Sequence, residues 1–265
     1  MKEPLRQPLV LVTNDDGYGT PGIEAMVAAL EAWATVLVIA PTHEQSACSH
    51  KFTLGRSLRY KKVGERRFSI EGTPADCVYL GVFGGERVAP RVPDLVVSGL
   101  NAGLNLGLDT YYSGTVAGAR EAAMRGVPGM AVSAAARTDL GRAARVCSHL
   151  ARNLLEVLEA PQPVVLNVNV PASGSWELRR TRLGRRVYGE GVEFRQDPRG
   201  REYLWLGGPG AARDDLSPGT DTHAVQAGAI GVTALPLMPC ERDSDAIVDA
   251  VLRAFEATDE KGSER

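Results

Sequence analysis

The stretch Leu9-Val10-Leu11-Val12-Thr13, followed at once by Asn14-Asp15-Asp16-Gly17, decides the fold of this chain. Apolar and β-branched residues without polar alternation predict a strand that is buried on both faces, which is typical of a parallel sheet covered by helices. The polar segment that follows ends the strand abruptly. Pro21 then suits the first turn of a helix, because proline at that position loses no hydrogen bond that the helix would use. The sequence therefore opens with a strand, a turn and a helix.

More strands of the same apolar kind follow along the chain, separated by helical patterns. They are expected at Thr35–Ala40, Asp94–Ser98, Gly129–Ser133 and Val164–Val170. Between the last two, apolar residues from Leu140 to Leu158 recur at i, i+3 and i+4, which indicates an amphipathic helix. Strands that alternate with helices predict an α/β protein with a Rossmann-like, doubly wound, mostly parallel sheet.

The segment from about residue 172 to 220 has a different character, being polar and rich in Arg and Gly. Asp197-Pro198-Arg199-Gly200 is a strong turn signal beside an alternating stretch at Tyr203–Leu206, so we expect a β-hairpin there. We therefore expect one domain over residues 1–265, with a core at about 8–171 and 221–257 and a hairpin excursion at about 172–220. The last elements are expected to be a strand within Ala229–Leu237, a helix at Asp245–Phe255 and a frayed tail over Thr258–Arg265.

Composition excludes several classes of protein. A formal net charge of −2 provides no basic field for a nucleic acid polymer, so any anionic substrate must be bound by a local site. No apolar run approaches the roughly 20 residues that span a bilayer. The N-terminus lacks the apolar stretch of a signal peptide, and the four cysteines form no C-x-x-C pair. We expect a cytoplasmic protein with reduced thiols and no membrane partner.

Three polar clusters follow predicted strands, and ligands bind at the carboxyl ends of strands in open parallel sheets. The clusters are Asn14–Gly17, His43–Ser46 and Ser98–Asn101. The adjacent carboxylates of Asp15 and Asp16 repel each other unless a cation or a proton lies between them. A surface turn that caps the next helix is the alternative interpretation. Carboxylate, hydroxyl and amide oxygens together favour Mg²⁺ or Mn²⁺ over zinc, so we predict a divalent metal held by Asp15 and Asp16.

A second candidate site is the helix that Ser113-Gly114-Thr115 opens. Small hydroxylated residues there supply either a simple N-cap or, beside a metal, a phosphate site built from free backbone N–H groups. No cluster of Arg or Lys accompanies the proposed metal, so neutral donors would have to share the charge of a phosphate. We expect Gly114 to matter because a Cβ there would block the approach of the phosphate.

The segment Gly17-Tyr18-Gly19-Thr20-Pro21-Gly22 also matches the G-x-G-x-x-G pattern of dinucleotide-binding proteins. Two features count against that alternative. Asp15 and Asp16 place negative charge beside the expected pyrophosphate, and the second strand ends at Ala40-Pro41 without an acidic residue for a ribose. His43, His50 and His149 are interpreted as surface or packing residues, and His223 is left out of the site.

Several gapped motifs, in register over about Leu9 to Leu237, resemble the SurE family of survival-protein nucleotidases. They are Asn14–Gly17, Ala40-Pro41 to Gln45-Ser46, Ser98–Asn105, Tyr112–Val116, Asp197–Gly200 with Tyr203 and Trp205, and Gly219–Thr222. Two positions depart from the family pattern. Ala47 stands where members often have Gly, and the segment Gly231–Pro236 lacks the usual Ser/Thr-Pro-Leu ending.

The resemblance implies a Rossmann-like core and a C-terminal excursion used in forming a dimer or tetramer. It also implies an enzyme that hydrolyses nucleoside 5′- and 3′-monophosphates, and sometimes short polyphosphate, with one divalent cation per subunit. The implied metal ligands are Asp15, Asp16, Ser46 and Asn101. The implied phosphate contacts are Asn105, Ser113 and Thr115. Gly114, between Ser113 and Thr115, is added to the predicted phosphate site because a Cβ there would block the approach of the phosphate.

The mechanism stays open at this point. Asp15 or Asp16 would accept a proton from an attacking water, or one of them would attack directly and form an aspartyl-phosphate. No separate general acid is evident. A metal- and nucleotide-binding sensor without turnover would use the same residues.

Overall fold

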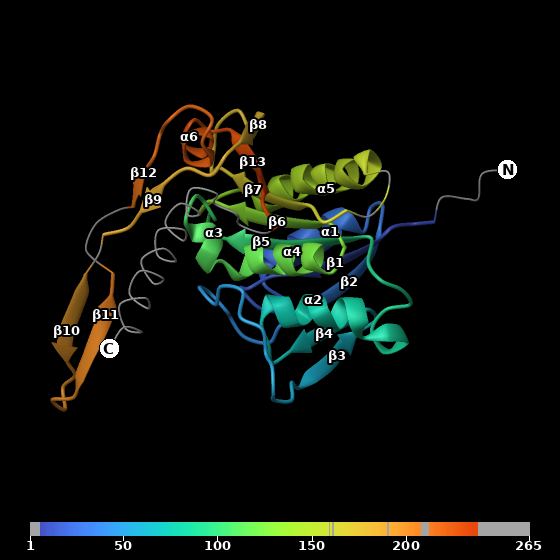
Figure 1. The fold of residues 1–265 in the computed structure, drawn as a ribbon, viewed down its shortest axis with the longest axis horizontal. Coiled ribbons are helices and arrows are strands. Elements are labelled where there is room, and N and C mark those ends of the chain that lie inside the picture. The colour runs from blue at the N-terminus through green and yellow to red at the C-terminus, as the bar shows by residue number, and fades with distance from the viewer. Residues whose placement is uncertain (1–5, 159, 161, 190, 208–211, 238–265) are drawn as a thin grey trace, which may run out of the picture. The chain divides into compact units, whose positions relative to one another are not determined.

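A nine-stranded sheet is the main element of the fold (Figure 1). The computed structural model describes residues 6–158, 160, 162–189, 191–207 and 212–237. The strand order is β3-β4-β2-β1-β5-β6-β7-β13-β8. The strands are β1 (Leu9–Thr13), β2 (Thr35–Pro41), β3 (Tyr60–Gly64), β4 (Arg67–Ile70), β5 (Leu95–Ala102), β6 (Gly129–Ala134), β7 (Val165–Val170), β8 (Leu178–Thr181) and β13 (Ile230–Leu235).

Neighbouring strands from β4 through β2, β1, β5 and β6 to β7 are all parallel, and β8 is parallel to β13. Only the pairs β3–β4 and β13–β7 of this sheet are antiparallel. The predicted mostly parallel sheet is therefore confirmed. Because β2, β1 and β5 lie side by side and point the same way, the loops that follow them meet at one edge of the sheet.

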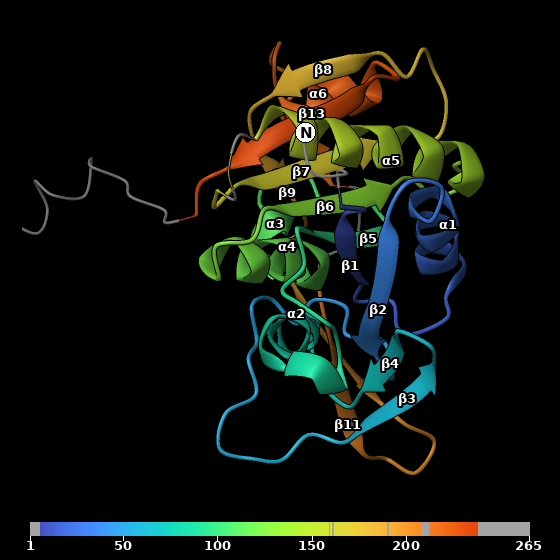
Figure 2. The same cartoon turned by 90° about the vertical axis from the view of Figure 1, so that its right-hand side faces the viewer.

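Helices cover both faces of the sheet (Figure 2). α1 (Pro21–Leu30) and α5 (Leu140–Val157) pack on one face, and α2 (Pro74–Phe83) and α4 (Gly114–Met124) pack on the other. Alternate residues of β1 pack into the hydrophobic cores on the two faces of the sheet. Val10 and Val12 belong to the core beneath α1 and α5, whereas Leu9 and Leu11 belong to the core beneath α2 and α4. This explains why β1 is apolar throughout.

The remaining elements are short: η1 (Gly85–Arg87), α3 (Asp109–Tyr112), β9 (Arg186–Val187), β10 (Val192–Gln196), β11 (Glu202–Leu206), β12 (Arg213–Asp214) and α6 (Asp221–Gln226). β10 and β11 form the predicted hairpin around the turn at Asp197–Gly200, and every residue of both strands is exposed. β8 falls inside the predicted excursion at 172–220 yet pairs with β13 in the main sheet.

The predicted helix at Asp245–Phe255, the tail from Thr258 and Cys240 lie outside the described residues. Within them, Cys48, Cys77 and Cys147 are not paired in disulfides. No described helix combines the length and the apolar character needed to cross a bilayer.

Candidate metal and phosphate site

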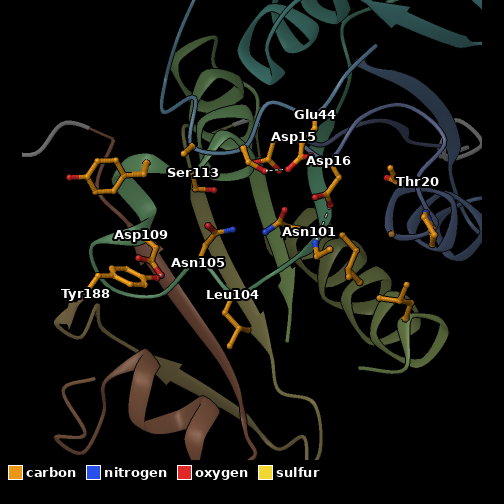
Figure 3. A pocket seen from close by; sticks show the side chains of 18 residues that line it. Asp15, Asp16, Thr20, Glu44, Asn101, Leu104, Asn105, Asp109, Ser113 and Tyr188 are labelled. Atoms are coloured by element: carbon orange, nitrogen blue, oxygen red, sulfur yellow. Dashed lines mark hydrogen bonds between the residues drawn. The ribbon is translucent and has the colours of Figure 1, made fainter. Parts of the chain in front are cut away.

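An open cleft of about 800 Å³ lies where the loops after β1, β2 and β5 meet (Figure 3). Six of the predicted site residues line it: Asp15, Asp16, Ser46, Asn101, Asn105 and Ser113. The cleft also contains Glu44 and Tyr112, which belong to quoted motifs without a predicted role, and Asp109 and Tyr188, which the sequence did not single out. Gly114 and Thr115 do not line the cleft. The structure therefore brings the three predicted clusters together and places the start of α4 beside them.

Asp15 is nearly enclosed, with 5% of its surface exposed. Its Oδ2 accepts the backbone N–H of Thr115 at 3.0 Å, and its Oδ1 accepts the Thr115 hydroxyl. Burial raises the pKa of Asp15 above its ordinary value, the Thr115 hydroxyl opposes the rise, and the charge of Asp16 adds to it. Both oxygens of Asp15 are thus fixed in direction by α4.

Asp16 is half-buried beside Asp15. Its Oδ2 accepts the backbone N–H of Ala102 at 3.0 Å, which ties the turn after β1 to the end of β5. Burial is the main cause that raises the pKa of Asp16, and the charge of Glu44 contributes to the rise. Asp15 and Asp16 therefore resist ionising together, and the charge of Glu44 adds to the rise for Asp16.

Ser46 and Asn101 each present an oxygen that their protein contacts leave available. The Ser46 hydroxyl donates to Oε1 of Glu44 at 2.6 Å, so its lone pairs stay free. The Asn101 amide nitrogen donates to the carbonyl of Gly103 at 2.7 Å, and Oδ1 has no donor among the described residues. The strand register of β5 against β6 shifts just before Asn101, and such irregularities re-aim side chains at strand ends.

The charge of the cleft is the main indication that a cation belongs there. Four acids line it and, among the described residues, no Lys or Arg does. Within the described chain, no group of three or more His, Cys, Asp and Glu side chains is placed to hold a metal. A metal at this cleft would therefore rely on Asp15 and Asp16 with the neutral oxygens of Ser46 and Asn101. This all-oxygen donor set fits Mg²⁺ or Mn²⁺.

Asn105 is held in place by the strands behind it. Its backbone N–H donates to Oδ1 of Asn169 at 2.9 Å, and its side-chain amide donates to Oγ of Ser133 at 2.7 Å. Its carbonyl accepts from the amides of Asn167 and Asn169 at 2.8 and 3.1 Å. Sequence reasoning missed this support, although two asparagines at alternate positions of a buried strand are a signal that could have found it.

The loop that carries Asn105 is also anchored from the C-terminal part of the sequence. The fully buried Asp221 accepts the backbone N–H of Gly107 at 2.9 Å and that of Gly184 at 2.7 Å. The motif Gly219–Thr222 therefore holds the cleft from behind. His223, which follows it on α6, does not line the cleft.

The start of α4 differs from the predicted open phosphate cradle. Ser113 is the N-cap, and its Oγ accepts the N–H of Val116 at 3.0 Å. The N–H of Thr115 is taken by Asp15, so of the first three helical N–H groups only that of Gly114 has no acceptor among the described residues. The phosphate contact predicted for Thr115 would require Thr115 to release Asp15.

Gly114 is required for a reason that the sequence did not reveal. A Cβ on this residue would stand 2.9 Å from Cβ of Asp15 and 2.9 Å from Sγ of Cys48. The absence of a side chain thus allows α4 to approach the end of β1 closely enough for Thr115 to reach Asp15.

Asp109 and Tyr188 form a second polar pair farther along the cleft (Figure 3). The Tyr188 hydroxyl donates to Oδ2 of Asp109 at 2.9 Å, and Nε of Arg186 lies 3.6 Å from the same oxygen. Burial raises the pKa of Asp109, with Tyr188 and Arg186 opposing the rise, and burial with the Asp109 contact raises the pKa of Tyr188 to about 12. Asp109 and Tyr188 are far apart in the sequence, so no motif joins them.

Comparisons with known proteins agree with this geometry. The family described as Survival protein SurE matches residues 10–190. A protein of Sorangium cellulosum named 5'-nucleotidase SurE is 53% identical over 234 residues, which cover 87% of this chain and 90% of that protein. A protein of the same name from an Anaeromyxobacter species is 43% identical over 262 residues, which cover 97% of this chain and 98% of that protein.

The crystal structure of the SurE protein from Aquifex aeolicus superposes with a TM-score of 0.77 at 35% sequence identity. The superposition covers 92% of this chain and 99% of that one. The resemblance inferred from the motifs therefore extends to the whole fold. The chain belongs to the SurE family.

Proposed function

We propose that the chain is a metal-dependent phosphomonoesterase that hydrolyses nucleoside 5′-monophosphates to nucleoside and phosphate. The observation that carries this proposal is a cleft lined by four acids and, within the described residues, by no Lys or Arg. A phosphate dianion cannot approach such a surface unless a cation intervenes. Relatives that carry the name 5'-nucleotidase at 43–53% identity support the choice of substrate. Nucleoside 3′-monophosphates and short polyphosphate are proposed as further substrates.

The proposed metal ligands are Asp15, Asp16, Ser46 and Asn101, which would hold one Mg²⁺ or Mn²⁺. When bound, such an ion polarises the phosphoryl group and lowers the pKa of a water molecule. Asp15 would serve as a rigid ligand, because Thr115 fixes both of its oxygens. Asp16 has an oxygen without a donor among the described residues and is the better candidate to accept a proton.

The phosphate would be bound by neutral donors beside the metal. These are the Ser113 hydroxyl, the N–H of Gly114 and the amide of Asn105. Hydrogen bonds to a charged acceptor are roughly twice as strong as neutral ones, and α4 directs the positive end of its dipole toward the same place. Thr115 would not contact the phosphate itself but would hold Asp15 in place through its hydroxyl and its N–H.

Self-association is proposed for the hairpin of β10 and β11. Phe194 and Leu204 are paired on one face of the hairpin, and Trp205 lies on the other. These side chains are 73%, 49% and 59% exposed. Exposed apolar side chains gathered on one element mark a protein interface, so we propose that the hairpin joins copies of the chain into a dimer or tetramer.

A phosphate-release assay tests the function. The pure protein would be incubated with Mn²⁺ or Mg²⁺ and a panel of nucleoside monophosphates, and again with a chelator. We expect phosphate release that requires the metal. Metal-dependent nucleotide binding without phosphate release would instead support the sensor alternative. The dinucleotide alternative is disfavoured by membership of the SurE family.

A further inference from the structure

The loop that carries Ser46, residues 42–58, is anchored to α4 by a hydrogen bond between His50 and the buried Glu121. Glu121, in the last turn of α4, is 2% exposed, and its Oε2 lies 2.9 Å from Nε2 of His50. Its other oxygen, Oε1, accepts from Nε of Arg125 at 2.7 Å. A carboxylate so deeply enclosed is costly unless both oxygens are paired, and here each oxygen has one partner.

The direction of the His50 contact follows from the charge of Glu121. Burial alone would raise the pKa of Glu121, but the contacts with His50 and Arg125 outweigh it and lower the pKa below its ordinary value. Glu121 is therefore a carboxylate that can only accept, and His50 must donate its Nε2–H. The contact is a directed hydrogen bond from the loop to the helix.

The loop needs such an anchor because part of its backbone is strained. Ala47 and Ser49 adopt φ values of 56° and 53°, a left-handed conformation that residues with a Cβ rarely adopt. Such conformations persist where the surroundings hold them. Ser49 is tied through its N–H to the carbonyl of Tyr112 at 2.9 Å, and His50 follows directly.

The strained segment lies between the metal cleft and the anchor. On one side, the N–H of Gln45 donates to the carbonyl of Asp15 at 2.7 Å, next to Ser46. On the other side, His50 binds Glu121, and the N–H of Thr53 donates to Oδ1 of Asp76 on α2 at 2.8 Å. The loop segment that carries Ser46 is therefore held between the turn after β1 on one side and helices α2 and α4 on the other.

We propose that His50 and Glu121 are positioning residues that hold the loop 42–58 so that the Ser46 oxygen faces Asp15 and Asp16. This inference rests on the proposed metal site. The pair contacts neither the phosphate nor the reacting atoms, so it acts through the affinity for the metal. Loss of the partners that hold metal ligands in place costs about 10- to 100-fold in metal affinity. His50 and Glu121 act on Ser46 through the intervening loop residues, so we expect a loss of about tenfold.

The test uses three variants of the full chain: His50→Ala, His50→Gln and Arg125→Ala. His50→Ala removes the anchor, whereas the Gln amide can still donate to Glu121. Arg125→Ala is the matched control, because it removes the other partner of Glu121 and leaves the loop contact intact. Amide hydrogen exchange over residues 43–53 is measured without metal, Mn²⁺ binding by calorimetry, and kcat at saturating Mn²⁺.

We expect His50→Ala to speed exchange at the N–H groups of Gln45 and Ser49 and to raise the Kd for Mn²⁺ about tenfold, with kcat close to wild type once Mn²⁺ is saturating. His50→Gln should restore both readouts. Arg125→Ala should lower Tm and leave both near wild type. The inference is overturned if His50→Ala changes neither readout, or if Arg125→Ala produces the same losses. Wild-type protein that takes up no Mn²⁺ would refute the metal site itself, and the exchange at Ser49 would still decide whether the anchor exists.

Discussion

The role of Thr115 can be decided by a substitution that changes little else. Thr115 is fully buried and donates to Asp15 through both its hydroxyl and its N–H. Thr115→Val replaces the hydroxyl by a methyl group of similar volume and keeps the backbone donor. The change therefore removes one hydrogen bond to a buried carboxylate and opens no cavity.

The size of the effect follows from the burial of Asp15. With 5% of its surface exposed, Asp15 cannot replace the lost donor by water. A hydrogen bond to a charged group contributes about 1.5–3 kcal/mol, and because this bond already exists without metal, its loss can weaken Mn²⁺ binding by up to about 150-fold. We expect Thr115→Val to weaken Mn²⁺ binding by an amount in this range and to lower kcat/KM at limiting Mn²⁺ in parallel.

The same substitution should move the pH dependence in a defined direction. Burial raises the pKa of Asp15, and the hydrogen bond from the Thr115 hydroxyl is the main contact that opposes this rise. Without that hydroxyl the pKa rises further, and protons compete with Mn²⁺ up to a higher pH. The acid limb of Mn²⁺ binding should therefore shift to higher pH in Thr115→Val.

Calorimetric Mn²⁺ titration at several pH values, together with steady-state kinetics, measures both effects. Thr115→Ser keeps the hydroxyl and should stay close to wild type. If Thr115→Val lowers kcat/KM at saturating Mn²⁺ while Mn²⁺ affinity is unchanged, Thr115 contacts the phosphate and our assignment is refuted.

Three further predictions concern stability and assembly. Burial raises the pKa of Asp16, so ionised Asp16 destabilises the metal-free fold at neutral pH, and this cost disappears as the pH falls through the folded-state pKa toward the unfolded value. Asp16→Asn should therefore raise the Tm of the metal-free protein at neutral pH and abolish the increase in Tm that Mn²⁺ gives the wild type. A lower Tm of the metal-free variant at neutral pH would contradict this. A Cβ on Gly22 would stand 2.0 Å from the carbonyl oxygen of Leu100, so Gly22→Ala should cost about 1–3 kcal/mol in chemical denaturation, whereas Gly141→Ala, whose Cβ meets nothing closer than 3.5 Å, serves as the control. Trp205→Ser with Phe194→Ser should shift the mass seen by light scattering toward the monomer, and an unchanged mass would remove the hairpin from the interface.

The strands and the main helices could be predicted because the spacing of apolar residues along each segment reflects which of its faces are buried. β1 and β2 are covered on both faces, so each reads as an unbroken apolar run, and α5 is covered on one face only, so its apolar residues recur with helical spacing. The direction of β13 could not be predicted, because an apolar strand looks the same whether it runs parallel or antiparallel to its neighbour.

The region of β3, β4 and α2 received no prediction, although one signal was present. Thr73 accepts the N–H of Asp76, the Asp76 side chain accepts the N–H of Thr73, and Pro74 occupies the first turn. This reciprocal cap is readable as Thr-Pro-x-Asp before an apolar stretch. α2 itself is short and mixes aromatic and β-branched residues, which blurs its helical spacing.

The candidate site divides in the same way. Its main residues could be predicted because Asp15, Ser46 and Asn101 lie at the ends of strands that are neighbours in the sheet, so the topology alone brings them together. The hydrogen bonds that hold these residues in place could not be predicted. The bonds from Thr115 to Asp15, from Asn105 to Asn169 and from His50 to Glu121 join residues 64 to 100 positions apart. The spacing of residues in a single sequence does not reveal which residues so far apart will be in contact.

The central claim is that Asp15, Asp16, Ser46 and Asn101 bind one divalent cation. The most direct test is a crystal grown with Mn²⁺ and measured at a wavelength where manganese scatters anomalously. We predict one anomalous peak per chain in the cleft, at about 2.0–2.3 Å from oxygens of Asp15 and Asp16, and its absence in crystals of Asp16→Asn. A peak elsewhere in the chain, or none in crystals of a protein whose phosphatase activity requires Mn²⁺, would contradict the account.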